Sequence, residues 1–136
     1  MYLAILKDHH KNIYDLIHTI QDCSSVEAVQ SHAEELSRSL SRLAGLIAIH
    51  LAAEDKILYP HLAKSPHEEI RETAASFNKE MGGLADAFTN FKGSYMTPSK
   101  IKANPQKYLS DSQQIIGALV QRLEHEDQKL YPLVEE

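Results

Sequence analysis

Apolar residues recur along most of the chain at steps of three and four, the period of an α-helix packed in a bundle. The pattern begins in residues 2–20, where one stripe holds a single polar member, His10. The apolar members of that stripe are Leu3, Leu6, Ile13, Ile17 and Ile20. Residues 21–23 interrupt the period, so residues 2–20 are predicted to form the first helix.

A second, long helix is predicted from about Ser25 to the Tyr59-Pro60 step. The capping-box pattern of residues 24–27 opens it, and Pro60, which has no backbone N–H, marks a kink or the end. Its inward stripe is Leu36, Leu40, Leu43, Ile47, His50, Glu54 and Ile57. A histidine and a glutamate one turn apart in a core are costly to bury unless something pairs with them.

Two further helices are each introduced by a polar residue and a proline. The third runs from Ser65-Pro66 to Lys92-Gly93, and the fourth starts at Asn104-Pro105 after an irregular connection over residues 94–103. The third helix is expected to present Ile70, Ala74, Phe77, Glu80, Leu84, Phe88 and Phe91 inward. The stripe of the fourth is Leu109, Ser112, Ile116, Leu119, Leu123, Glu126 and Leu130.

No segment alternates apolar and polar residues over the length of a strand, so an all-α fold is predicted. Four helices joined mostly by short connections indicate an up-down-up-down antiparallel four-helix bundle, formed as a single domain by residues 1–136. With 43% hydrophobic and 24% charged residues, the composition is that of a globular protein.

Charge, hydrophobicity and cysteine content indicate which partners and which cellular compartment to expect. The net charge is −5 and no Lys/Arg cluster occurs, which argues against nucleic-acid binding. No apolar run approaches the ~20 residues of a membrane span. Cys23 is the single cysteine and cannot form an internal disulfide, and the early first helix leaves no room for a signal peptide. We therefore expect a cytoplasmic protein that does not bind membranes.

The ends of the second and fourth helices repeat one another. His50-x-x-x-Glu54 precedes Leu58-Tyr59-Pro60, and Arg122-x-x-x-Glu126 precedes Leu130-Tyr131-Pro132. In an antiparallel bundle these two helices run in the same direction and sit diagonally across the core. The two glutamates are therefore expected to face each other across the interior.

His10 and Glu80 are expected to reach the same layer from the first and third helices. Helix bundles hold metal ions with histidine and carboxylate side chains that converge from several helices. This mixture of ligands suits iron, manganese or zinc. The candidate metal ligands are His10, His50, Glu54, Glu80 and Glu126. The remaining histidines, His9, His18, His32, His61, His67 and His125, are interpreted as surface residues.

Residues 8–17, together with the two repeated segments, resemble the hemerythrin-like, or HHE cation-binding, family. The resemblance spans essentially the whole chain and implies a four-helix bundle with a non-haem di-iron centre. Members bind oxygen or nitric oxide, repair iron–sulfur clusters, or sense iron and redox state. The resemblance implies that His10, His50 and Glu54 supply the ligands of one iron and a bridging carboxylate. Glu126 matches the second bridging carboxylate.

The other half of the site departs from the family pattern. The third helix offers Glu80 where a histidine is expected, and the fourth has Arg122, whose guanidinium stays protonated and cannot ligate a metal. His125 lies one residue from the inward stripe. Our hypothesis is that Arg122 fills the space of the second iron and makes bidentate bonds to Glu126 and Glu80, so that a single metal remains.

Two functions of different classes follow. The first is a hemerythrin-like protein with mononuclear or di-iron, or alternatively zinc or manganese, that binds a small diatomic ligand or senses iron or redox state. The second is a metal-free bundle in which Arg122 replaces a metal, and which acts through a protein partner or as a homodimer. No nucleophile is paired with a base, so no enzymatic activity is expected beyond a redox reaction at a bound metal.

Overall fold

The computed structural model describes residues 2–134, and every regular element in that range is a helix. The long helices are α1 (Tyr2–Gln21), α3 (Ala33–Ala53), α5 (Glu68–Ser94) and α7 (Pro105–His125). The short helices are α2 (Val26–Ser31), α4 (Tyr59–Ala63) and α6 (Pro98–Ala103). Two π-helical segments, η1 (Glu54–Leu58) and η2 (Glu126–Leu130), and a 3-10 turn, η3 (Tyr131–Leu133), complete the elements. The predicted all-α fold class is confirmed.

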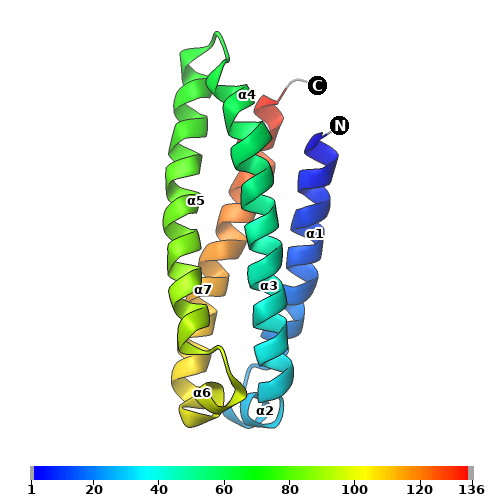
Figure 1. Ribbon diagram of the computed structural model, residues 1–136, viewed down its shortest axis with the longest axis vertical. Helices are drawn as coiled ribbons and strands as arrows, with labels where there is room; N and C mark the ends of the chain where they lie inside the picture. The colour runs from blue at the N-terminus through cyan, green and yellow to red at the C-terminus, as the bar shows by residue number, and fades with distance from the viewer. Residues whose placement is uncertain (1, 135–136) are drawn as a thin grey trace.

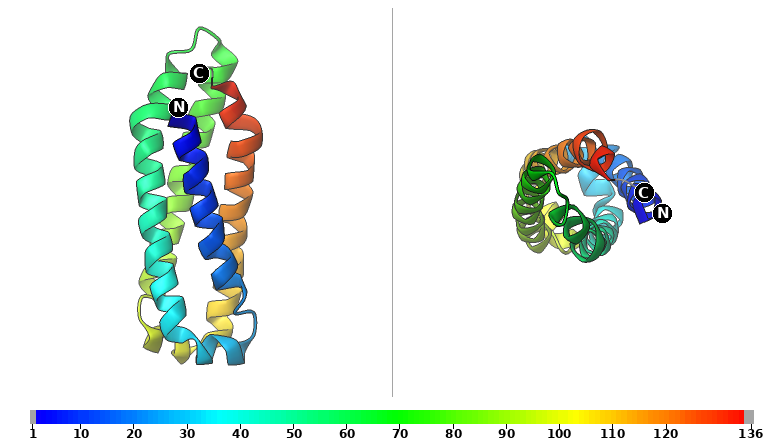
Figure 2. Two further views of the ribbon diagram at one scale, coloured as in Figure 1. Left: turned by 90° about the vertical axis from the view of Figure 1, so that its right-hand side faces the viewer. Right: turned by 90° about the horizontal axis from the view of Figure 1, so that it is seen from above.

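The long helices lie side by side and enclose one interior (Figure 1). Helix α1 packs against α3 and α7, and α5 packs against the same two helices, so α3 and α7 occupy opposite corners. Seen from above, the long helices surround a common axis (Figure 2). Both ends of the described chain lie at one end of the bundle, and α2 and α6 close the other. No helix within residues 2–134 is both long and apolar enough to cross a membrane.

Side-chain caps fix several helix starts. The Ser25 hydroxyl accepts a hydrogen bond from the Ala28 N–H, so the cap lies one residue later than the capping-box pattern of residues 24–27 implies. The Asn104 side chain accepts a hydrogen bond from the Lys107 N–H, so the predicted cap of the fourth helix is confirmed. Thr97 caps α6 in the same way. The connection predicted to be irregular over residues 94–103 therefore contains a short helix, because Thr97-Pro98 is itself a cap followed by a proline.

The predicted second helix differs from the structure at both ends. Its first part is a separate helix, α2, and the chain re-enters a helix after His32. At the other end Pro60 does not stop the helix, which continues through η1 into α4 as far as Ala63. Within η1 the Tyr59 N–H donates to the carbonyl of Glu54, five residues back instead of four. The proline therefore follows a widened turn that already departs from the α-helical ladder.

The π-helical turn also changes which side chain points inward. One extra residue in the turn moves the stripe forward by a position, so Leu58 is fully buried while Ile57 is 45% exposed. The prediction that Ile57 lies on the inward stripe is therefore wrong. The same turn occurs in η2, where the Tyr131 N–H donates to the carbonyl of Glu126. The sequence repeat is thus also a repeat of backbone geometry.

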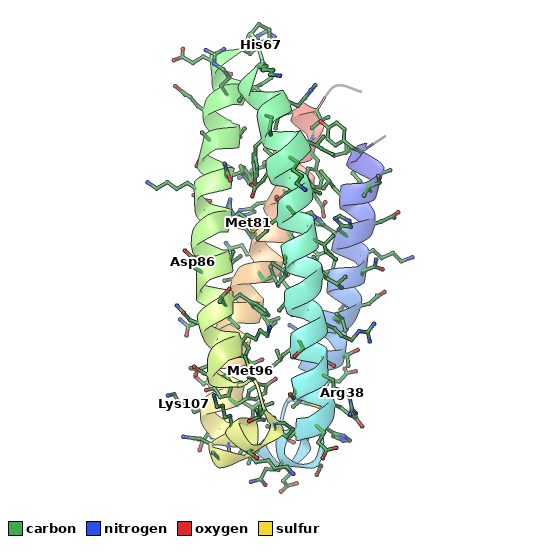
Figure 3. All side chains as sticks on the ribbon, in the orientation of Figure 1. Arg38, His67, Met81, Asp86, Met96 and Lys107 are labelled. Carbon is green, nitrogen blue, oxygen red and sulfur yellow. The ribbon has the colours of Figure 1, made fainter. Side chains whose placement is uncertain are left out.

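On α5 the buried position between Phe77 and Leu84 belongs to Met81, which is 3% exposed. Met81 lies on the inner side of the helix in Figure 3, whereas Asp86 points outward. The side chain of Glu80 is 53% exposed. The prediction that Glu80 lies on the inward stripe is therefore wrong: both residues fit helical spacing, and burial selects the apolar one.

The interior is divided into two apolar clusters with a polar layer between them. One cluster fills the end near α2 and α6, around Leu40 and Leu123. The other lies near the chain ends and includes Leu6 and Leu58. The buried histidines and glutamates, His10, His50, Glu54 and Glu126, are between 0% and 2% exposed. The bundle thus places a set of titratable groups in a setting nearly free of solvent.

Candidate metal centre

His10 and His50 meet through their Nε2 atoms, which lie 3.1 Å apart. The Glu126 Oε1 atom lies 3.0 Å from the first nitrogen and 3.4 Å from the second. These three side chains come from α1, α3 and the start of η2, and their ligand atoms all lie within 4.8 Å of one another. The bundle therefore brings three groups of metal-ligand type to one point, and such a group could hold a metal ion.

Glu54 completes the layer from the start of η1. Its Oε2 atom lies 3.4 Å from the His50 Nε2 atom. The other carboxylate oxygen, Glu54 Oε1, is buried without a hydrogen-bond partner, and so is Glu126 Oε2. Unpaired buried carboxylate oxygens are costly, and a bound cation would satisfy both. The residues present therefore fit a metal ion, although their role as ligands stays a prediction.

The outward nitrogen of each imidazole is also held. The His10 Nδ1–H donates to Asp127 Oδ1 at 3.0 Å, which leaves Nε2 as the atom facing the layer. The Nδ1 atom of His50 lies 3.2 Å from the Nδ1 atom of His9, which is half-buried. The interpretation of His9 as a surface residue is therefore wrong, because His9 steadies a buried imidazole.

Charges within the layer shift the pKa values strongly. Burial opposes a charged imidazole, but hydrogen bonds to Glu126 and Glu54 outweigh it and raise the pKa of His50 to about 9. Burial, reinforced by the negative charge of Glu126, raises the pKa of Glu54 well above its usual value. Burial acts likewise on Glu126, but hydrogen bonds to the two imidazoles hold its pKa below the usual range. Without a metal, the negative charge of the carboxylates in this layer is therefore balanced by bound protons.

Tyr131 is a member of this layer that the sequence analysis missed. Its hydroxyl oxygen lies 2.9 Å from the His10 Nε2 atom and donates a hydrogen bond to Glu54 Oε2 at 3.1 Å. Its role could not be read from periodicity, because Tyr131 follows a π-helical turn. The repeated Tyr-Pro step was the available signal. Asp127, next to Glu126 in that repeat, was likewise given no role.

Arg122 lies outside the imidazole group. Its guanidinium forms an ion pair with Glu80 and stacks over the Phe77 ring, 4.6 Å from the ring centroid. The predicted bond to Glu80 is thus present, but Glu126 directs Oε1 to the histidines and has no partner at Oε2. The predicted bidentate contact between Arg122 and both glutamates is therefore wrong, and Glu80 does not reach the imidazoles.

Of the other histidines interpreted as surface residues, four are exposed: His18, His32, His61 and His67. His125 is half-buried and takes no part in the His10, His50 and Glu126 group. A surface hollow of about 440 Å³ reaches the layer beside His10 and Asp127, with Lys7, Lys11 and Tyr14 also in its wall. Of the buried group, His10 is the member that lines this hollow.

The helical bundle and the buried histidine–carboxylate group together define an α-helical protein equipped to bind a cation. Over residues 1–134 the sequence matches the hemerythrin HHE cation binding domain. The chain belongs to this family, as the sequence resemblance implied. Comparisons with curated proteins and with solved structures gave no match.

Proposed function

We propose that the protein binds iron through His10, His50, Glu54 and Glu126 and acts in the binding of a small diatomic ligand or in iron or redox sensing. The convergence of two imidazole nitrogens and a carboxylate oxygen within 4.8 Å carries this proposal. Imidazole and carboxylate together suit iron, with zinc and manganese as the alternative metals. Family membership supports a cation as the ligand.

Iron held at this point supplies a redox couple and a binding position for a small ligand. The protein's part is to fix and shield the group. Asp127 and His9 orient the two imidazoles from outside, and the apolar clusters on either side restrict water. A small ligand approaches through the hollow of about 440 Å³ beside His10. No group-transfer enzyme activity is proposed, and we place the protein in the cytoplasm.

A single metal ion fits the charges of the layer better than two. Two buried carboxylates, Glu54 and Glu126, balance one divalent cation. The α5–α7 side of the layer supplies an arginine paired with Glu80 in place of further ligands. A second cation there would lie close to the fixed positive charge of Arg122, which disfavours it.

A second candidate function is a metal-free interaction module that acts through a protein partner or as a homodimer. The observation that favours it is the proton balance of the layer, in which protonated His50 pairs with Glu126 without any metal. In this reading Arg122 and Glu80 stabilise the fold where a family member would hold its second ion.

Binding of Fe²⁺ to chelator-treated protein in the absence of oxygen separates the two candidates. We expect the melting temperature to rise with Fe²⁺, because a ligand that binds only the folded state stabilises it. His50→Ala should abolish that rise, whereas His61→Ala should retain it, since His61 is exposed and takes no part in the His10, His50 and Glu126 group. An unchanged melting temperature of the wild-type protein across added Fe²⁺, Zn²⁺ and Mn²⁺ would favour the metal-free module.

A further inference from the structure

Tyr131 is buried at the turn that follows η2, and only 1% of its surface is exposed. A tyrosine hydroxyl in a core usually finds a hydrogen-bond partner. Here the hydroxyl enters the histidine–carboxylate group itself. This position calls for an explanation beyond packing.

The distances place the Tyr131 oxygen among the candidate ligand atoms. It lies 2.9 Å from His10 Nε2 and 3.4 Å from His50 Nε2. For comparison, the His10 nitrogen lies 3.0 Å from Glu126 Oε1 and 3.1 Å from the His50 nitrogen. The phenol oxygen is thus as close to the centre of the group as the atoms already assigned to metal binding.

The hydrogen-bond roles of the phenol leave its oxygen available to this centre. The hydroxyl hydrogen is donated to Glu54 Oε2. The oxygen remains free to accept, and the nitrogens within reach of it are the Nε2 atoms of the two imidazoles. A cation placed among those nitrogens and Glu126 would meet a third type of donor, the phenol oxygen.

The sequence repeat contains an internal comparison for this arrangement. Tyr59 occupies the matching position after η1 and is 8% exposed. Its hydroxyl is buried without a hydrogen-bond partner, whereas that of Tyr131 is in the imidazole group. The Tyr-Pro step therefore does not by itself bring a phenol to the imidazoles. The tyrosine whose hydroxyl reaches the imidazoles is Tyr131, which belongs to the second repeat. In that repeat Arg122 stands at the position that His50 has in the first.

We propose that Tyr131 is a metal ligand of this chain and binds ferric iron as a phenolate. This inference rests on the proposed iron site. Glu54 and Glu126 balance a divalent ion, and one further anionic oxygen balances a trivalent ion, which leaves the buried site neutral. On binding, the phenol proton and the protons held on the other ligand groups of the layer are released to solvent, the oxygen–iron bond forms, and the oxidation state of the ferric ion does not change. Phenolate is a hard donor suited to Fe³⁺.

The test is the visible spectrum of protein loaded with Fe³⁺, with bound iron measured on the same sample. A phenolate on ferric iron produces a phenolate-to-iron charge-transfer band, and resonance Raman spectra excited in that band show tyrosine ring modes. We expect the band in the wild-type protein, its loss in Tyr131→Phe with iron still bound, and its retention in Tyr59→Phe. A Zn²⁺-loaded sample should be colourless.

The outcomes separate this inference from the proposed function. Wild-type protein that binds ferric iron without the band, or a Tyr131→Phe variant that keeps it, would refute the phenolate ligand while leaving the iron site standing. Failure of the wild-type protein to bind iron would refute both. If Tyr131→Phe does not fold, Tyr14→Phe and Tyr59→Phe decide: retention of the tyrosine modes in both supports Tyr131, and loss in either overturns the assignment.

Discussion

Replacement of Asp127 by alanine should weaken metal binding although Asp127 itself is not a proposed ligand. The carboxylate accepts the Nδ1–H of His10 at 3.0 Å and thereby keeps Nε2 directed into the layer. Without this acceptor the imidazole can rotate or place its proton on Nε2, where it would block the metal. Loss of such an outer partner lowers metal affinity about 10–100-fold.

The exposure of Asp127 sets where in that range the effect should fall. Its side chain is 39% exposed, so water screens the charge and can partly replace the lost acceptor. We therefore expect a loss at the lower end, about tenfold, which corresponds to ~1.4 kcal/mol. Asp127→Asn keeps an acceptor oxygen without the charge, so its affinity should lie between those of the wild type and Asp127→Ala.

Competition between the protein and a chelator for Fe²⁺ or Zn²⁺ measures this affinity directly. Asp55→Ala is the matched control, because Asp55 follows Glu54 as Asp127 follows Glu126, and it is exposed. Circular dichroism of each variant checks that the helices are retained. Equal dissociation constants for Asp127→Ala and Asp55→Ala would refute the argument that the outer hydrogen bond orients His10.

Three further results are expected. Arg122→Ala should lower the free energy of unfolding by about 1–2 kcal/mol, measured by urea titration, because the partner of Arg122, Glu80, is largely exposed. A loss of ~3–5 kcal/mol would indicate a fully buried ion pair instead. The pKa of His50 is raised in the folded protein, so protonated His50 stabilises the metal-free protein fully below pH 6.5, and this stabilisation is lost as the pH rises through about 9. The urea midpoint of the wild-type protein should therefore fall between pH 6.5 and about pH 9. In His50→Gln the urea midpoint should fall less over the same interval. Metal at about 100 times its dissociation constant should add ~2.7 kcal/mol to wild-type stability, and a similar gain in His50→Ala would contradict the site.

Most of the fold follows from the hydrophobic pattern. Each long helix matches a predicted helical segment, and most of its buried residues lie on the predicted stripe, because apolar spacing reports directly on which face packs inward. The pattern fails after Glu54, where Leu58 replaces Ile57 as the buried residue. A π-helical turn adds one residue to the repeat, and an analysis that assumes a constant α-helical period cannot register it.

The candidate site was predictable in its centre and less so at its edges. His10, His50, Glu54 and Glu126 are polar residues at core positions, an anomaly visible in the sequence. Glu80 was predicted to join them because its helical spacing fits the inward stripe. In the structure the charged Glu80 side chain is exposed and the apolar side chain of the next residue, Met81, is buried instead. Spacing also cannot show how far a side chain reaches across to another helix.

Tyr131 illustrates this last point. In the sequence it is the equal of Tyr59, and both follow a glutamate by the same number of residues. Only the three-dimensional arrangement distinguishes them, since one hydroxyl meets His10 and the other has no hydrogen-bond partner. Sequence reasoning identified the helices that carry the site but not every side chain that enters it.

The central claim is that the layer around His10 and His50 holds a metal ion. The most direct test is the metal content of protein purified without chelators, measured together with an anomalous-scattering map of its crystals. The account predicts a single ion, iron, with density between His10, His50 and Glu126, and its loss in His50→Ala. Protein that contains no metal after purification and takes up none on reconstitution, or whose metal lies elsewhere and survives His50→Ala, would contradict the account.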